Sequence, residues 1–234
     1  MSRSTPTPLH RFHLELLEAY GPQGWWPLLG HPGTNPTKTG SITGYHPGDY
    51  TFPHDEAERF EICAGAILTQ NTAWPNVEKA LAALAASGTL EPGAILRLPD
   101  PELASLIRPS GYHNTKARKL KELAAFFLGL RGRTPARSEL LAVWGVGPET
   151  ADSIRLYAYG EPEMVVDAYT RRVLDRLGWT SAPSSYENLK HVCVEYLPVG
   201  TELCQEFHAL VVEHAKRARA ARAEDWRRPI LHQD

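Results

Sequence analysis

Apolar residues recur at three- and four-residue intervals along most of the chain. In residues 56–70 the apolar positions Phe60, Cys63, Ala64, Ile67 and Leu68 follow this spacing, which is typical of an amphipathic α-helix. Because no run alternates convincingly with the two-residue period of a strand and no internal repeat is present, the predicted fold class is all-α. Further helices are expected over residues 8–20, 76–87, 115–132, 138–144, 148–160, 168–179, 185–197 and 202–222.

Prolines and glycines mark several of the predicted helix ends. Pro75 allows a new helix to begin, and Gly88 closes it. A short helix within residues 95–111 is expected to start at Asp100 as its N-cap, with Pro101 in the first helical position. Residues 21–55 are instead rich in Gly, Pro, Thr and His without a sustained period, which predicts a long irregular segment of the kind that is often functional.

The chain length and composition are those of an ordinary globular protein. A chain of 234 residues suffices for one large domain or for two small ones that share a core. No stretch approaches the roughly 20 apolar residues of a membrane span, and residues 1–12 lack the apolar core of a signal peptide. Three scattered cysteines (Cys63, Cys193, Cys204) suggest neither a disulfide framework nor a zinc site, so a cytoplasmic protein without a membrane partner is expected.

The net charge of −2 discriminates little, but two runs are locally basic. Either run would suit nucleic-acid phosphates, although a solvated helix face is the commoner explanation for one such patch. The first run holds Lys116, Arg118, Lys119 and Lys121, and the second holds Lys216, Arg217, Arg219, Arg222, Arg227 and Arg228.

The strongest local pattern is a helix pair joined by a glycine turn in residues 140–160. Gly145 and Gly147 permit positive φ and close backbone approach, and Pro148 suits the first position of the second helix. The free N–H groups at that helix start would hold an anion such as a DNA phosphate. Taken alone, such a turn is more often a corner between helices that binds nothing.

Asp167 changes that balance, because it lies eighteen residues after Glu149 at the mouth of the next helix. Its ordinary role there is an N-cap, and a helix N-terminus also favours the ionised carboxylate. With Val166-Asp167 following the hairpin, residues 56–216 resemble the helix-hairpin-helix DNA glycosylases that include endonuclease III. The resemblance implies that Asp167 is catalytic, and that two helical lobes (1–55 plus 165–234, and 56–164) flank a DNA-binding cleft.

Further segments resemble one branch of that superfamily, the 3-methyladenine DNA glycosylases. They are residues 66–74 (AILTQNTAW), 107–120 (IRPSGYHNTKARKL), 145–152 (GVGPETAD) and 25–27 (WWP). An iron-sulfur cluster like that of endonuclease III needs four cysteines, and only Cys204 lies near the C-terminus, so no cluster is expected. Glu149 occupies the place of the lysine that forms a Schiff base in bifunctional glycosylases, so the strand would stay unbroken.

The resemblance also implies roles for the other candidate residues. Gln70 and Asn71 resemble wedge residues that fill the gap left by a flipped base, and Tyr112 would fill from the opposite strand. The ordinary alternatives are helix capping for Gln70 and Asn71 and a surface aromatic for Tyr112. For the tryptophans named next, the ordinary alternative is core packing. The base pocket would comprise Trp25, Trp26, Pro27, Trp74 and Lys216, while the hairpin residues Gly145, Gly147, Glu149 and Thr150 would contact DNA. The carbonyls of Leu141, Val143 and Val146 would bind a Na⁺ or K⁺ ion.

The expected function is therefore a monofunctional glycosylase of base excision repair. It would flip alkylated purines such as 3-methyladenine out of double-stranded DNA and hydrolyse the N-glycosidic bond, acting as a nucleoid-associated monomer. One alternative is a glycosylase for oxidised or mismatched bases on the same fold. Another is a non-catalytic helix-hairpin-helix module, although binding a polyanion alone gives no use for the Asp167 carboxylate.

Overall fold

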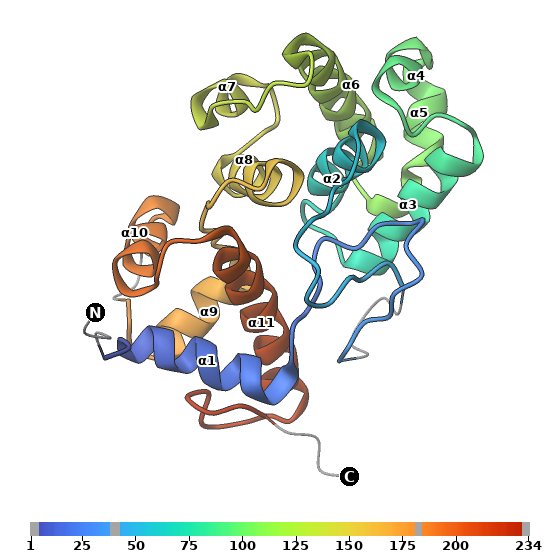
Figure 1. Cartoon of the computed structure of the whole chain (residues 1–234). Helices are drawn as coiled ribbons and strands as arrows, with labels where there is room; N and C mark the ends of the chain where they lie inside the picture. Colours follow the sequence, from blue (N-terminus) through green and yellow to red (C-terminus); the bar gives the residue numbers. More distant parts are fainter. Residues whose placement is uncertain (1–4, 38–42, 181–183, 231–234) are drawn as a thin grey trace.

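The computed structural model describes residues 5–37, 43–180 and 184–230, which form helices linked by turns and loops (Figure 1). Within these ranges the extended pairing is limited to an isolated bridge between Thr34 and Thr43, so the all-α prediction is confirmed. The helices are α1 (Pro8–Tyr20), α2 (Glu56–Leu68), α3 (Trp74–Ala86), α4 (Pro92–Arg97), α5 (Asp100–Leu106), α6 (His113–Leu130), α7 (Arg137–Ala142), α8 (Pro148–Ser153), α9 (Ala168–Arg176), α10 (Tyr186–Tyr196) and α11 (Thr201–Ala220), with a 3₁₀ turn at Arg108–Ser110 and a π-helical turn at Ile154–Ala158.

The first lobe is built around α2. This helix packs against α3, α6 and the π-helical turn, while α4 and α5 cover α6. Residues 62–68 of α2 are buried without a break, because this helix has neighbours on almost every side. The Phe60 ring meets Phe127 of α6 edge-on at a centroid distance of 5.1 Å. The α7–α8 pair lies at the side of this lobe that faces the second lobe (Figure 1).

The second lobe consists of α1, α9, α10 and α11. The long helix α11 packs against both α1 and α9 and is buried from Cys204 to Ala215. Several of these buried positions are polar, and buried polar groups require hydrogen-bond partners. The polar residues concerned are Gln205, Glu206, His208, Glu213 and His214.

The irregular segment between α1 and α2 contacts both lobes. The backbone N–H of Gln23 and the hydroxyl of Tyr50 donate to the Glu206 carboxylate of α11 at 2.9 and 3.1 Å. In the other direction, the Leu29 N–H donates to Glu61 of α2 at 2.7 Å. The lobe boundaries at 55 and 165 stay a prediction, since this segment joins the lobes instead of belonging to one. Its residues 38–42 lie outside the described residues.

Two local expectations were wrong. Asp100 does not cap α5, because Pro99 occupies the N-cap position and Asp100 is already the first helical residue, from which its carboxylate pairs with Lys121 of α6. The segment 148–160 is not one regular helix, because α8 passes into a π-helical turn after Ser153. None of the described helices has the length and apolar character needed to cross a membrane.

Candidate active site

A cavity of about 550 Å³ opens where the two lobes and the irregular segment meet. It contains Asp167 together with aromatic, carboxylate and amine side chains that are far apart in the sequence. Its lining residues are Trp25, Trp26, Pro27, Tyr45, Thr69, Asn71, Thr72, Ala73, Trp74, Pro75, Glu149, Ser153, Asp167, Ala168, Tyr169, His208, Val212 and Lys216.

Asp167 is held by the start of α9. Its Oδ1 atom accepts hydrogen bonds from the Thr170 backbone N–H at 2.7 Å and from the Thr170 hydroxyl at 3.0 Å. The preceding residues Val165 and Val166 are buried and anchor the chain. The expected N-cap role is therefore present, and it occupies one carboxylate oxygen while Oδ2 faces His208 at 3.8 Å from Nε2.

The electrostatic surroundings keep the Asp167 carboxylate ionised. Burial is the largest influence on its pKa and raises it, but His208 and the two donors of Thr170 together outweigh burial. The resulting pKa lies below the usual value of an aspartate. A carboxylate that is sheltered from water yet negatively charged is suited to stabilising positive charge that develops beside it.

His208 was missed in the sequence. It is 5% exposed on α11, and its Nδ1 lies 2.8 Å from the hydroxyl of Tyr157 in the π-helical turn. The available signal was the spacing of His208, Val212 and Lys216, since positions four residues apart share one face of a helix. Because α11 is buried on nearly all sides, that face could not be distinguished from ordinary core by its pattern.

The predicted aromatic residues do line the cavity. The indole rings of Trp26 and Trp74 meet edge-on at a centroid distance of 5.1 Å, and Trp25 presents its ring edge-on to His208 at 5.4 Å. Trp26 is only 5% exposed and also touches Tyr157, so it serves the core as well as the cavity wall. Tyr45, which the sequence did not single out, completes this wall.

Two further charged groups share the cavity with Asp167. Lys216 lines it as predicted, and burial lowers the pKa of its amine while Glu213 and Asp167 act in the opposite sense. Glu149, predicted as a hairpin contact to DNA, also lines it. Burial and the charge of Asp167 raise the pKa of Glu149, against the effect of His208. The two carboxylates thus have pKa values displaced in opposite directions.

The hairpin between α7 and α8 is joined to the predicted wedge turn. Gly145 has φ +89°, and a Cβ there would lie 2.4 Å from Cγ of Lys119, so glycine lets the lysine chain cross the turn. The Lys119 amine donates to Gln70 Oε1 at 2.5 Å. The Gln70 amide in turn donates to the Gly145 carbonyl at 3.1 Å and to the Thr150 hydroxyl at 3.0 Å.

These contacts separate the two predicted wedge residues. Gln70 is fixed to the hairpin, whereas Asn71 is exposed, adopts φ +55° and lines the cavity. Tyr112 is 72% exposed in a left-handed conformation before α6 and does not line the described cavity. The structure therefore brings Asn71 to the site and leaves Tyr112 on the surface, where its DNA contact stays a prediction.

The basic residues of α6 differ in what they contact. Lys116 is buried and donates to the carbonyls of Leu68 and Ser110, both at 2.7 Å, so it supports the fold instead of facing phosphates. Arg118 instead lies over the half-exposed Trp144 ring of the hairpin, 4.2 Å from its centroid. With Lys121 paired to Asp100, as described above, Arg118 and Lys119 are the members of the run that lie beside the hairpin.

The carbonyls of Leu141, Val143 and Val146 stay a predicted site for a monovalent ion. Helix α7 ends at Ala142, so the carbonyl of Leu141 belongs to a last turn that lacks intrahelical donors. The Val143 carbonyl accepts from the Val146 N–H at 3.1 Å and retains a second lone pair. Among the described residues, no group of three or more His, Cys, Asp or Glu side chains could hold a metal ion.

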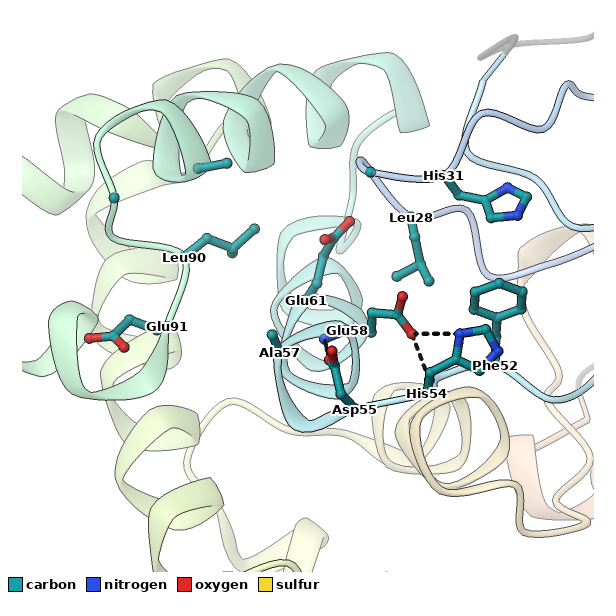
Figure 2. A pocket seen from close by; sticks show the side chains of 13 residues that line it. Leu28, His31, Phe52, His54, Asp55, Ala57, Glu58, Glu61, Leu90 and Glu91 are labelled. Atoms are coloured by element: carbon teal, nitrogen blue, oxygen red, sulfur yellow. Dashed lines mark hydrogen bonds and ion pairs between the residues drawn. The ribbon is translucent and has the colours of Figure 1, made fainter.

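A second cavity, of about 690 Å³, lies beside α2 (Figure 2). It is bordered by His54, Asp55, Glu58, Glu61 and Glu91, and His54 pairs with Glu58. Burial and the charge of Glu58 raise the pKa of Glu61 to about 7, against the hydrogen bond from Leu29. A carboxylate-rich cavity of this kind repels phosphate, so the cavity around Asp167 is the better candidate for chemistry on DNA.

Comparison with known proteins agrees with this geometry. The family model described as HhH-GPD superfamily base excision DNA repair protein matches residues 64–198. The chain is 37% identical over 220 residues to MJ1434 of Methanocaldococcus jannaschii, a protein named provisionally as a DNA repair glycosylase. The alignment covers 89% of this chain and 87% of that protein.

Solved structures extend the similarity to the whole fold. The H. pylori 3-methyladenine DNA glycosylase MagIII, bound to 1,N6-ethenoadenine, superimposes with a TM-score of 0.67 at 25% identity over 90% of this chain and 98% of that one. A trapped covalent complex of endonuclease III with DNA has a TM-score of 0.59 at 27% identity over 66% and 72% of the two chains. Both similarities agree with the two-lobed, all-α architecture.

Proposed function

Because the chain belongs to the HhH-GPD superfamily of base excision DNA repair proteins and is a DNA glycosylase, we propose that its substrates are alkylated purines such as 3-methyladenine. It hydrolyses their N-glycosidic bond after base flipping and leaves the strand unbroken. The observation that carries this proposal is an ionised Asp167 in a cavity walled by Trp25, Trp26 and Trp74. The similarity to a 3-methyladenine glycosylase supports it.

The aromatic wall accounts for the preference among bases. A purine alkylated on a ring nitrogen carries positive charge, and a cation over an aromatic face gains roughly 0.5–2 kcal/mol. The tryptophan faces therefore favour the charged, damaged base over a neutral one. Asn71, which lines the cavity beside them, takes the place of the flipped nucleotide in the helix, while Gln70 braces the turn from the hairpin side.

Asp167 supplies the chemistry. As the N-glycosidic bond breaks, its electron pair leaves with the base and positive charge develops on the sugar, where the carboxylate stabilises it. A water molecule then forms the new bond to the sugar carbon and loses a proton. Asp167 either accepts this proton or orients the water for its attack. Since an alkylated purine is already a good leaving group, the reaction needs little acid assistance.

The remaining parts of the site serve DNA binding. The start of α8, with Gly147 before it and Arg118 and Lys119 beside it, holds phosphates of double-stranded DNA. A Na⁺ or K⁺ ion on the carbonyls of Leu141, Val143 and Val146 would reinforce that grip by neutralising phosphate charge. The protein acts as a monomer, and no iron-sulfur cluster takes part.

The test is base release from methylated double-stranded DNA, with strand integrity followed in parallel. Release of 3-methyladenine with strands intact until alkali treatment is expected. Release only from oxidised or mismatched DNA would instead favour the related glycosylase function. DNA binding without any release would favour a non-catalytic module.

Strand cleavage has its own test, because Lys216 is an amine in the same cavity. We expect no borohydride-trapped adduct with the wild type and some trapping with Glu149→Lys, which places an amine beside Asp167. Trapping by the wild type that disappears in Lys216→Ala would show that Lys216 attacks the sugar and would refute the monofunctional assignment. A folded Glu149→Lys variant without any adduct would remove the support for position 149 as the determinant.

A further inference from the structure

We propose that His208 is the positioning residue of Asp167, presenting an N–H to its free carboxylate oxygen while Tyr157 holds the imidazole from behind. This inference rests on the proposed catalytic role of Asp167. Three consecutive contacts carry it: Thr170 fixes Oδ1, His208 Nε2 lies 3.8 Å from Oδ2, and the Tyr157 hydroxyl lies 2.8 Å from His208 Nδ1.

The 3.8 Å separation has a chemical consequence. It is too long for a direct hydrogen bond but suits attraction between charges or dipoles. Oδ2 is therefore steered by the imidazole without having its lone pairs occupied, so it remains available to the sugar or to the attacking water. Oδ1, in contrast, is committed to two donors on Thr170.

The Asp167 carboxylate, which faces Nε2, favours the ring tautomer that carries its proton on Nε2. In that neutral tautomer the Tyr157 hydroxyl donates to Nδ1, and the single ring proton resides on Nε2. When the imidazole takes up a second proton, Nδ1–H donates to the Tyr157 oxygen, whose own proton turns to the Gln205 carbonyl at 3.3 Å. Burial raises the pKa of Tyr157, so that hydroxyl retains its proton throughout.

The groups around His208 define the electrostatics. Asp167 faces it from the start of α9, Glu149 from α8 and Tyr157 from the π-helical turn, while Trp25 contributes an uncharged ring edge. On α11 itself, Lys216 lines the same cavity. His208 lowers the pKa of both Asp167 and Glu149, so its loss would leave two carboxylates in one cavity without that compensation.

The deciding experiment compares His208→Ala with the wild type in single-turnover base release between about pH 5 and pH 8. In the wild type the pKa of Asp167 is lowered, so its protonation should not limit the rate in this range. Without His208 one lowering influence is lost while burial remains, so the pKa of Asp167 should rise, and the rate should fall by up to about tenfold for each pH unit below the new pKa. His208→Gln, which retains an N–H donor, should recover part of the loss.

His214→Ala is the matched control, since it also removes a buried, tyrosine-bonded histidine from α11, but away from the cavity. Its rate per folded molecule should stay flat with pH. A His208→Ala rate that falls equally at every pH would reduce His208 to packing and overturn the inference. If His208→Ala does not fold, Tyr157→Phe decides: it should steepen the acid dependence, and a flat profile would overturn the inference.

Failure of the underlying assignment would look different. If Asp167→Asn still releases bases at the wild-type rate, the carboxylate is not catalytic and the proposed function of the site fails. If Asp167→Asn is inactive while His208→Ala keeps the wild-type pH profile, the inference about His208 alone fails. Binding to DNA that contains a stable abasic-site analogue should not be weakened in any of these variants.

Discussion

Helix α11 carries two buried histidines that are alike on one side and different on the other. The Nδ1 atoms of His208 and His214 lie 2.8 and 3.0 Å from tyrosine hydroxyls, those of Tyr157 and Tyr20. The Nε2 atom of His214 lies 2.9 Å from the Trp226 carbonyl. The Nε2 atom of His208 instead faces the Asp167 carboxylate across 3.8 Å.

This difference separates a structural histidine from a functional one. His214 is saturated by fixed partners, and through Tyr20, which accepts from the Ile230 N–H at 2.6 Å, it secures the C-terminal tail. Burial lowers the pKa of His214, which favours the neutral ring that such a role needs. His208 has one fixed partner and one ionisable partner in a cavity, so its proton can influence chemistry. A buried histidine bonded to a tyrosine hydroxyl thus serves either the fold or the reaction, and the group that faces its Nε2 atom decides which.

The largest expected effect is a loss of folding stability in His214→Ala, which removes the structural histidine of the pair. Removing the ring leaves the Trp226 carbonyl and the Tyr20 hydroxyl short of a partner, each costing about 1–3 kcal/mol when buried. The Tm should fall by about 2–4 °C for each kcal/mol lost. Thermal unfolding measures this change, with His191→Ala, which alters an exposed ring, as the control. A larger fall in His208→Ala than in His214→Ala would contradict the assignment of roles.

A third buried histidine gives a smaller, pH-dependent effect. His13 of α1 is 3% exposed, and its Nδ1 has no partner among the described residues. Burial, with a contribution from His10, lowers the pKa of His13 to about 4. The folded state therefore binds this proton more weakly than the unfolded state, so stability is lost as the pH falls from about 6.5 towards 4, by at most about 3 kcal/mol.

Chemical denaturation of the wild type and His13→Leu at pH 7 and pH 5 tests this expectation. The variant should lose less stability on acidification than the wild type. Equal losses would mean that His13 takes up its proton without cost in the folded state.

The smallest expected effect distinguishes the two tyrosines. Tyr157→Phe removes the hydroxyl behind His208 but keeps the ring, so the base-release rate at neutral pH should fall by only about 2- to 10-fold, within the range of about 1 kcal/mol for one hydrogen bond. Tyr20→Phe should leave the rate unchanged and lower the Tm instead. Rate constants and melting temperatures measured for both variants would show whether the roles are exchanged.

The sequence was sufficient for the fold class and for most of the cavity. Asp167 could be found because an N-cap aspartate at a set distance from a glycine hairpin is visible in a linear pattern. The tryptophans and Lys216 were assigned through a family resemblance, and the structure does bring them together around Asp167. Trp74 and Asp167 lie at the starts of helices and Trp25 and Trp26 in a distinctive local motif, whereas Lys216 lies within α11.

The features that the sequence did not predict depend on contacts between distant segments. His208 sits on a helix that is buried all round, where a periodic pattern does not single out one face. The attachment of Gln70 to the hairpin requires Lys119 of α6 to cross Gly145, which no local pattern reports. Asp100 was misassigned because its carboxylate pairs with Lys121 of α6, a distant segment, while Asp100 itself is the first residue of the helix.

The most direct test of the central claim is base release by Asp167→Asn, with Asp55→Asn as the matched control. Both aspartates cap helices through their side chains, and asparagine is an equally good cap, so both variants should fold. Asp167→Asn should lose about 10²- to 10⁴-fold in the rate of release from methylated DNA while still binding it, and Asp55→Asn should lose nothing. Wild-type release by Asp167→Asn would contradict the assignment of the catalytic site.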